Sequence, residues 1–265
     1  MTLGFVEFMD RFMAATSWEM TTPKPYGAFH LIFTFAGLAL SIFLAYKLRR
    51  LGERGHRVVL FCVGMLLILT EFYKQGFYYF YIEPHKYNFG IFPFHLCSVP
   101  MYLCIVAAFI KNGKLRDGIC GFMSTYNLLG GFMAFIEPSG LNHSYLTLTL
   151  HAYFWHMSLV FVGIYLIASG HFAKTKKDYV SATITFVALC VVAFIINVSL
   201  GEISGGAINM FFVGPRNSSL IVFKWISENF GWYISTLLYI PTVAAGAYLI
   251  YLPAHLWAQK KKCNM

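Results

Sequence analysis

Stretches of about 20 apolar residues recur along the whole chain, and they limit the possible folds more than any other feature. A helix of this length spans about 30 Å, which is the thickness of the hydrocarbon core of a bilayer. Of the 265 residues, 58% are hydrophobic and only 12% are charged, which excludes a water-soluble domain of this size. A transmembrane β-barrel is excluded because its strands are only about 10 residues long and alternate apolar with polar positions. The sequence predicts an all-α integral membrane protein.

The apolar stretches predict a seven-transmembrane-helix bundle that forms one membrane domain over residues 1–265. The predicted spans are 26–48, 57–79, 92–111, 115–136, 147–169, 178–198 and 231–254. Residues 1–16 have apolar side chains at helical spacing beside charged ones, which predicts an amphipathic helix lying on the membrane surface. Residues 199–230 are rich in glycine and predict an extracytoplasmic loop or cap.

Lysine and arginine residues gather in alternate loops and predict the orientation of the chain. Loops rich in these residues stay in the cytoplasm. Of the 20 basic residues, 14 lie on one side, at 47–57, 111–116, 174–177 and 260–262. The N-terminus is therefore expected outside and the C-terminus in the cytoplasm, in the plasma (cytoplasmic) membrane. Topology and anionic lipid headgroups explain the net charge of +9, so no nucleic-acid partner is expected.

Ionisable and polar residues inside the predicted spans gather at one depth. Such residues are costly in a bilayer and mark functional sites. At a rise of about 1.5 Å per residue, they lie between about 6 and 14 Å below the outer ends of their spans. The residues in this layer are His30, Glu71, Lys74, Cys97, Asn127, His151 and His156. Because the cytoplasmic halves of the spans have almost no comparable residues, the layer predicts a polar site in the outer half of the membrane.

Cys97 and the histidines of the fifth span suggest nucleophilic chemistry. A thiol in apolar surroundings is inert, but an adjacent histidine can convert it to a nucleophilic thiolate. His151 lies at the depth of Cys97, whereas His95 would point about 200° away from it on a regular helix. The alternative is a hydrogen-bonded histidine beside a packing cysteine. Glu71 and Lys74 would then form an internal ion pair that lets their helix enter the membrane.

Neither a metal site nor a disulfide framework is expected. His151 and His156 are five residues apart and point about 140° away from each other, unlike metal ligands on one helix face. Five of the six cysteines lie within or at the edge of predicted spans, where an oxidised scaffold has no place. No cofactor is expected.

Three short motifs occur in a characteristic order. Segment 92–97 reads Phe-Pro-Phe-His-Leu-Cys, 151–156 reads His-Ala-Tyr-Phe-Trp-His, and 207–212 reads Ala-Ile-Asn-Met-Phe-Phe. This pattern resembles the family of YwaF-like bacterial membrane proteins and transmembrane protein 164, with similarity from about residue 30 through 232. The resemblance implies acyl transfer between glycerophospholipids without acyl-CoA, with Cys97 as the nucleophile and His156 at the family's histidine. The fold is also similar to membrane hydrolases of fatty-acid esters that use a threonine and a histidine.

The expected function is intramembrane acyl transfer through a thioester on Cys97, with membrane phospholipids and lysophospholipids as partners. His156, or failing that His151, would act as the general base, and His95 or Asn127 would donate to the oxyanion. Lys74 would hold a lipid phosphate, and Glu71 and His30 would complete the substrate site. These roles remain predictions from the sequence.

Three other outcomes remain open. Attack of water on the thioester would make the protein a lipid hydrolase. A transporter or channel would use the buried polar groups to relay protons or bind a solute. A receptor-like protein would use the same layer as a ligand pocket without covalent chemistry. The last two functions predict that replacing Cys97 has little effect.

Overall fold

The computed structural model describes the backbone of residues 3–263 and the side chains of residues 4–260. Apart from one isolated bridge between Glu19 and Tyr145, these residues form helices, turns and loops, without a β-strand. The first two residues of the predicted 1–16 helix and the side chains of Lys261 and Lys262 lie outside the described part. The predicted all-α fold class is confirmed.

Six helices in the described part of the chain are long and apolar enough to cross a membrane. They are α2 (Ala28–Leu48), α3 (Glu53–Phe77) with its π-helical extension η1 (Tyr78–Ile82), α5 (Lys114–Phe122) joined through the π-helix η3 (Met123–Asn127) to α6 (Leu128–Ile136), α7 (Leu146–Ser169), α8 (Lys176–Leu200) and α10 (Trp232–Cys263). Large apolar side chains such as Ile184 and Val191 are exposed on their outer faces, where lipid would cover them. The protein is a multi-pass membrane protein.

The third predicted span differs from the structure in its first part. Helix α4 (Val99–Phe109) has 11 residues, about 16 Å, and the residues before it are irregular except for the short 3-10 helix η2 (Phe89–Ile91). Two prolines explain this. Phe92, before Pro93, is extended with φ −49° and ψ 133°, as a residue before proline prefers. Pro100 lies at the start of α4, where its missing N–H is harmless.

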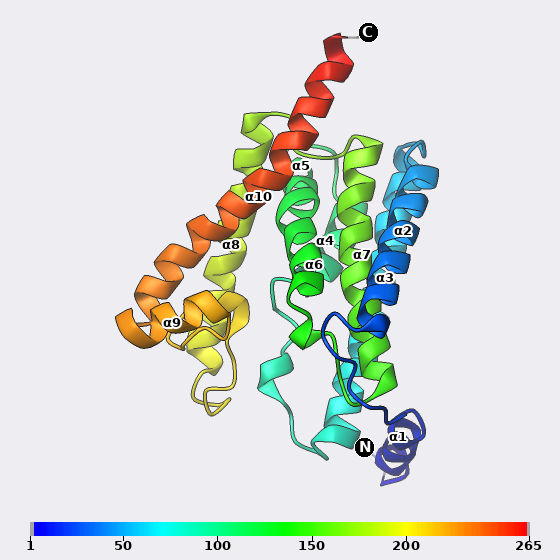
Figure 1. The fold of residues 1–265 in the computed structure, drawn as a ribbon, viewed down its shortest axis with the longest axis vertical. Coiled ribbons are helices and arrows are strands. Elements are labelled where there is room, and N and C mark those ends of the chain that lie inside the picture. The colour runs from blue at the N-terminus through cyan, green and yellow to red at the C-terminus, as the bar shows by residue number, and fades with distance from the viewer. Residues whose placement is uncertain (1–2, 264–265) are drawn as a thin grey trace.

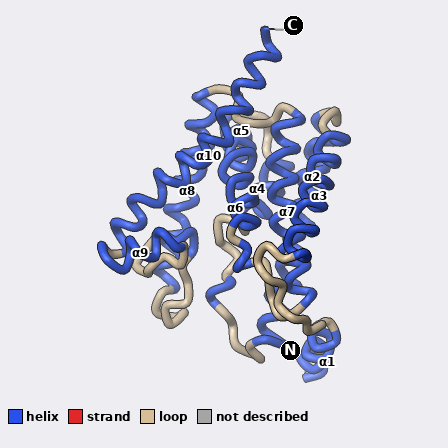
Figure 2. Tube along the Cα trace, in the orientation of Figure 1, coloured by secondary structure: helices blue, strands red, loops and turns tan. Residues whose placement is uncertain are grey.

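The helices run up and down between two ends of the molecule (Figures 1 and 2). One end, called here the α1 end, carries α1 (Leu3–Ala15) and the segments 83–98, 137–145 and 201–231. The other, called the basic end, carries the loops 49–52, 110–113 and 170–175 and the last turns of α10. Helix α7 is central, because it packs against α2, α3, η3 and α6.

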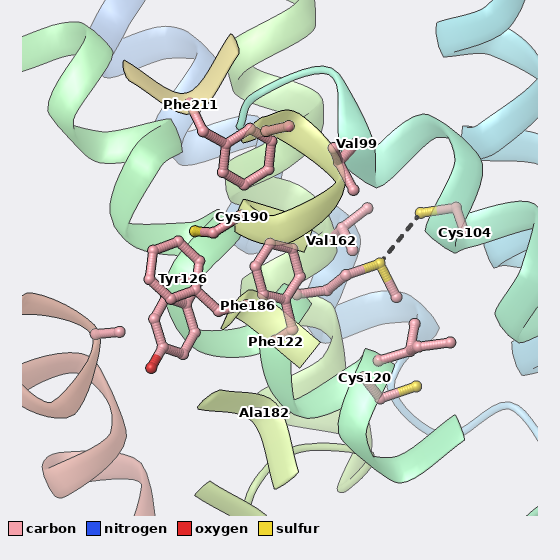
Figure 3. Packing of buried hydrophobic residues seen from close by; sticks show 14 of the residues in the cluster. Val99, Cys104, Cys120, Phe122, Tyr126, Val162, Ala182, Phe186, Cys190 and Phe211 are labelled. Carbon is pink, nitrogen blue, oxygen red and sulfur yellow. Dashed lines mark hydrogen bonds between the residues drawn. The ribbon is translucent and has the colours of Figure 1, made fainter. Parts of the chain in front are cut away.

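A large apolar core joins α4, α5 and α8 with the loop that follows α8 (Figure 3). The rings of Phe122, Tyr126 and Phe186 stack in this core, with centroids 5.6 and 4.6 Å apart for successive pairs. Cys104 contacts the Met123 sulfur at 3.6 Å. The five cysteines whose side chains are described are all free.

The 199–230 segment is more ordered than its glycine content suggests. It contains helix α9 (Ile221–Phe230), which the sequence analysis missed, and a loop held by one buried side chain. Asn197 donates to the carbonyls of Met210 (2.9 Å) and Val213 and accepts from the Met210 N–H at 2.6 Å. Phe211 is then buried, with its ring 5.8 Å from that of Phe94. The loop therefore covers the segment that leads to Cys97.

Candidate functional site

The backbone around Cys97 is irregular but well supported. Gln75 on α3 donates to the Ile91 carbonyl at 2.8 Å, and the His95 ring lies 2.9 Å from the Gly90 carbonyl. The indole N–H of Trp155 on α7 donates to the carbonyl of Cys97 itself at 2.9 Å. Polar backbone at this depth needs such partners, because lipid supplies none. Cys97 itself packs against apolar residues of α3 and α7.

A buried ion pair lies on α3 beside this segment. Lys74 Nζ is 2.9 Å from Glu71 Oε1, which also accepts from Gln75 at 2.7 Å. The ammonium lies 5.8 Å from the centroid of the Trp155 ring. The ion pair that the sequence analysis offered as a structural alternative is therefore present. The second Glu71 oxygen, Oε2, is nevertheless buried without a hydrogen-bond partner.

The two histidines of α7 lie in different surroundings. His151 stacks on Trp155, with ring centroids 5.4 Å apart, and its Nε2 is buried without a partner. His156 bonds the Ala152 carbonyl through Nδ1 at 2.9 Å, and its ring meets the edge of Phe135 at 6.4 Å. Through Trp155, His151 lies on the side of α7 that faces Cys97. In the described part of the chain no hydrogen bond joins the thiol to either ring.

His30 and Asn127 form hydrogen bonds within the bundle. His30 Nδ1 accepts from the Tyr26 N–H at 3.0 Å, and its ring lies 6.3 Å from that of Tyr153 on α7. Asn127 donates to the Leu159 carbonyl at 3.2 Å. It ends the π-helix η3, a geometry frequent at functional sites. The predicted layer thus divides around α7, with His30 and His156 on one side and Cys97, Glu71, Lys74 and His151 on the other.

Several buried polar atoms in and beside this layer have no hydrogen-bond partner among the described residues. Most buried polar groups in proteins are bonded, so a concentration of unpaired ones indicates a place for water or a ligand. The atoms concerned are His30 Nε2, Thr34 Oγ1, Glu71 Oε2, Gln75 Oε1, Asn127 Oδ1 and His151 Nε2. We name Cys97, Glu71, Lys74, His151 and Trp155 the thiol cluster.

A cavity of about 430 Å³ lies between the 89–98 segment, which carries Cys97, and the 201–219 loop. His95, Asn209 and Arg216 are among its lining residues. His95 was predicted as an oxyanion donor, whereas the sequence pattern predicts no role for Asn209 or Arg216. Nothing in the sequence around Arg216 predicts a binding role. Arg216 lies near Gly90 and His95 only because of the tertiary fold.

A second polar cluster lies at the basic end, where the sequence analysis expected almost nothing comparable. Arg116 is only 3% exposed and forms a salt bridge of 2.8 Å with Glu53. His56 is fully buried, and its ring stacks on that of His171 at 3.8 Å. This expectation was therefore wrong, because Arg116 and His56 sit at helix starts that the charge pattern alone places in solvent.

Burial lowers the pKa of His171, which lies between α7 and α8, below its ordinary value. The Glu53 carboxylate opposes the shift, and the Arg116 guanidinium adds to it, so both act on the pKa through charge. At the α1 end, burial likewise lowers the pKa of His143. Among the described residues, no group of three His, Cys, Asp or Glu side chains is arranged to hold a metal ion.

The model of the TMEM164 family matches residues 23–251. The chain belongs to the TMEM164 family. The match covers every helix from α2 to α9 and most of α10, and thus both the thiol cluster and the cavity of this TMEM164-family protein. No curated protein and no solved structure matches the chain.

Proposed function

We propose that this protein is a membrane acyltransferase that moves a fatty-acyl chain between glycerophospholipids through a thioester on Cys97. One observation carries the proposal. A free thiol lies on a supported, non-helical segment beside the buried Glu71–Lys74 pair and a histidine nitrogen without a partner. Its resemblance to the acyl-transferring members of its family supports the same chemistry.

His151, rather than His156, is the better general base. His151 is on the side of α7 that faces Cys97, and its Nε2 is free to take a proton. The thiol proton passes to this nitrogen as sulfur attacks the ester carbonyl carbon. The ester C–O bond then breaks, the leaving glycerol oxygen takes the proton from His151, and a lysophospholipid departs. An incoming lysophospholipid hydroxyl reverses these steps and restores the thiol.

Lys74 is better suited than Asn127 or His95 to stabilise the oxyanion. The Asn127 amide already donates to the Leu159 and Met123 carbonyls, so only its acceptor oxygen is free. His95 Nε2 is engaged by the Gly90 carbonyl. Lys74 uses one contact on Glu71 and has further N–H groups for charge that develops on the substrate oxygen.

The orientation that fits this chemistry has the α1 end outside and the basic end in the cytoplasm. The lysines and arginines of the inter-helix loops gather at the basic end, as the positive-inside rule requires. Residues 89–98 together with α4 would form the third of seven crossings. Cys97 would then lie near the edge of the outer hydrocarbon layer of the plasma membrane, where the lipid ester groups are.

A solute-binding protein without covalent chemistry is the second candidate, because the unpaired polar atoms of the layer would also suit a polar solute. The two functions differ in what Cys97 does. The test is intact-protein mass spectrometry after incubation with phosphatidylcholine vesicles. We expect a fatty-acyl adduct that hydroxylamine removes and that Cys97→Ser abolishes.

Cys62→Ser is the matched control, because Cys62 is a free, exposed cysteine on α3 outside the thiol cluster. This variant should form the adduct at the wild-type rate. An adduct that persists in Cys97→Ser, or the absence of adduct and lysolipid from every variant, would contradict the proposal and favour solute binding. Free fatty acid without acyl transfer to a lysolipid would make the protein a hydrolase.

A further inference from the structure

The cavity between the 89–98 segment and the 201–219 loop is lined by one cation, Arg216, and by no carboxylate of the described residues. Its walls are formed by Gly90, His95, Gly206, Ala207, Asn209, Phe212, Arg216, Asn217 and Ser219. Its volume, about 430 Å³, lies in the range of about 300–1,000 Å³ that is usual for small-molecule sites. A guanidinium, side-chain amides and a hydroxyl are groups that bind a phosphate in other proteins, whereas the His95 ring already bonds the Gly90 carbonyl.

Arg216 is positioned by the loop but is not neutralised by it. A Cβ on Gly206 would lie 2.7 Å from Arg216 Cζ, so a side chain at this position would displace the guanidinium. Gly206 also has a φ of +84°, which favours glycine. The guanidinium donates to the Gly201 carbonyl over a long 3.4 Å, and it forms no salt bridge within the described residues. Most of its five N–H donors are therefore available to a ligand.

The loop that carries Arg216 is rigid enough to form a binding site. Asn197 holds its backbone, and Phe211 and Phe212 adopt positive φ values of 54° and 56°. Such strain in residues with a side chain persists only where the surroundings impose it, and it is common at ligand sites. Asn209 Oδ1, in the cavity wall, is buried without a hydrogen-bond partner among the described residues, which indicates a place for a ligand or a water.

We propose that this cavity binds a phosphate group, with Arg216 as its main ligand, and that the phosphate belongs to the headgroup of the phospholipid substrate. The assignment to a headgroup rests on the proposed acyl transfer. His95, in the cavity wall, is two residues from Cys97, at most about 7 Å along the chain. A lipid whose phosphate is bound here would present its glycerol esters to the thiol. Lys74, the phosphate ligand expected from the sequence, does not line this cavity and is assigned to the oxyanion instead.

The test measures binding in the full-length Cys97→Ser protein, in which a thioester cannot form. Native mass spectrometry of the detergent-solubilised protein compares phosphatidylcholine with a diacylglycerol that has the same acyl chains. Arg216→Gln should weaken phosphatidylcholine binding by about tenfold and leave diacylglycerol binding unchanged. Arg216→Lys keeps the charge and should restore most of the affinity. Lys224→Gln is the control, because Lys224 is an exposed cation on α9 outside the cavity.

Inorganic phosphate at millimolar concentration distinguishes the two sources of the phosphate group. Competition with phosphatidylcholine that disappears in Arg216→Gln supports a headgroup site. If phosphate binding depends on Arg216 but phosphatidylcholine binding does not, the cavity is a site for free phosphate and the headgroup assignment fails. If inorganic phosphate and phosphatidylcholine bind equally weakly to Arg216→Gln and Lys224→Gln, or if neither variant loses affinity for either ligand, the phosphate site itself is overturned. None of these results depends on acylation of Cys97, so the proposed function can fail or stand separately.

Discussion

The two ends of the bundle both bury charged groups, but they satisfy these groups differently. At the basic end, Arg116 Nε donates to the Ala107 carbonyl and Arg57 Nη1 to those of Ala108 and Ile110, with distances of 2.7–2.8 Å. These carbonyls at the end of α4 have no partner within the helix. Both guanidinium groups also contact Glu53 at 2.8 Å. At the α1 end, Glu71 Oε2 and His151 Nε2 have no hydrogen-bond partner in the part of the chain that the structure describes.

Whether a buried charged group has all its hydrogen-bond partners within the protein distinguishes a structural role from a binding role. Depth in the membrane distinguishes these roles less well. The arginines of the basic end complete the backbone hydrogen bonding of α4, as cations at a helix C-terminus commonly do. In this cluster only His56 Nε2 and Arg116 Nη2 lack a partner, within the described residues. Among the described residues, the α1 end leaves acceptors and two histidine nitrogens unpaired on α2, α3, η3 and α7, where we propose that the substrate binds.

The strongest test of the α1 end compares its two α7 histidines. His151→Ala should slow formation of the acyl adduct on Cys97 by about 10²–10⁴-fold, because general base catalysis contributes that much. His156→Ala should slow it by less than about tenfold, since His156 bonds its own helix and packs on Phe135. Single-turnover mass spectrometry of the adduct gives both rates. A larger effect of His156→Ala than of His151→Ala would show that His156 is the general base. It would refute the choice of His151, which rests on the contact of His151 with Trp155.

The sequence predicts the helices better than it predicts the site. Apolar runs of bilayer length identify the six long helices of the described residues. A helix in contact with lipid must be apolar over that length whichever neighbours it packs against. The start of α4 was predicted incorrectly, because Pro93 was placed inside a helix rather than before one. Cys97, Glu71, Lys74 and His151 were predicted to share one site, and the structure brings them together around Trp155.

Long-range contacts explain what the sequence could not provide. His30, His151 and His156 lie at similar predicted depths. Depth alone therefore cannot show which of them faces the same side of α7 as Cys97. Arg216 joins the cavity only through the turns that Asn197 supports, 13 to 16 residues ahead in the chain. Arg116 and Arg57 bond to α4 carbonyls that no side-chain pattern reveals.

Replacing the ion pair tests whether the α1 end is built for stability or for chemistry. Lys74→Met leaves Glu71 buried without its cation and should cost about 3–5 kcal/mol of unfolding free energy. The double variant Glu71→Gln, Lys74→Met removes both charges and should recover most of that loss. Thermal unfolding in detergent measures the stability, and adduct formation measures the chemistry. A double variant that is stable but forms no adduct supports a functional pair, whereas one that forms the adduct normally makes the pair structural.

Arg116→Met provides the opposite test at the basic end. The substitution leaves the Ala107 carbonyl without its donor, and the expected loss of unfolding free energy is about 1–3 kcal/mol. Loss of the Glu53 contact adds little, because the Glu53 side chain is 41% exposed and keeps Arg57 as a partner. Arg50→Met, in the exposed 49–52 loop at the same end, should leave stability unchanged. The acylation rate of Cys97 should not change in either variant. Arg116 contacts the C-terminal end of α4, whereas Cys97 precedes its N-terminal end. If Arg116→Met slowed acylation while stability held, the basic end would take part in function, and the distinction drawn between the two ends would be wrong.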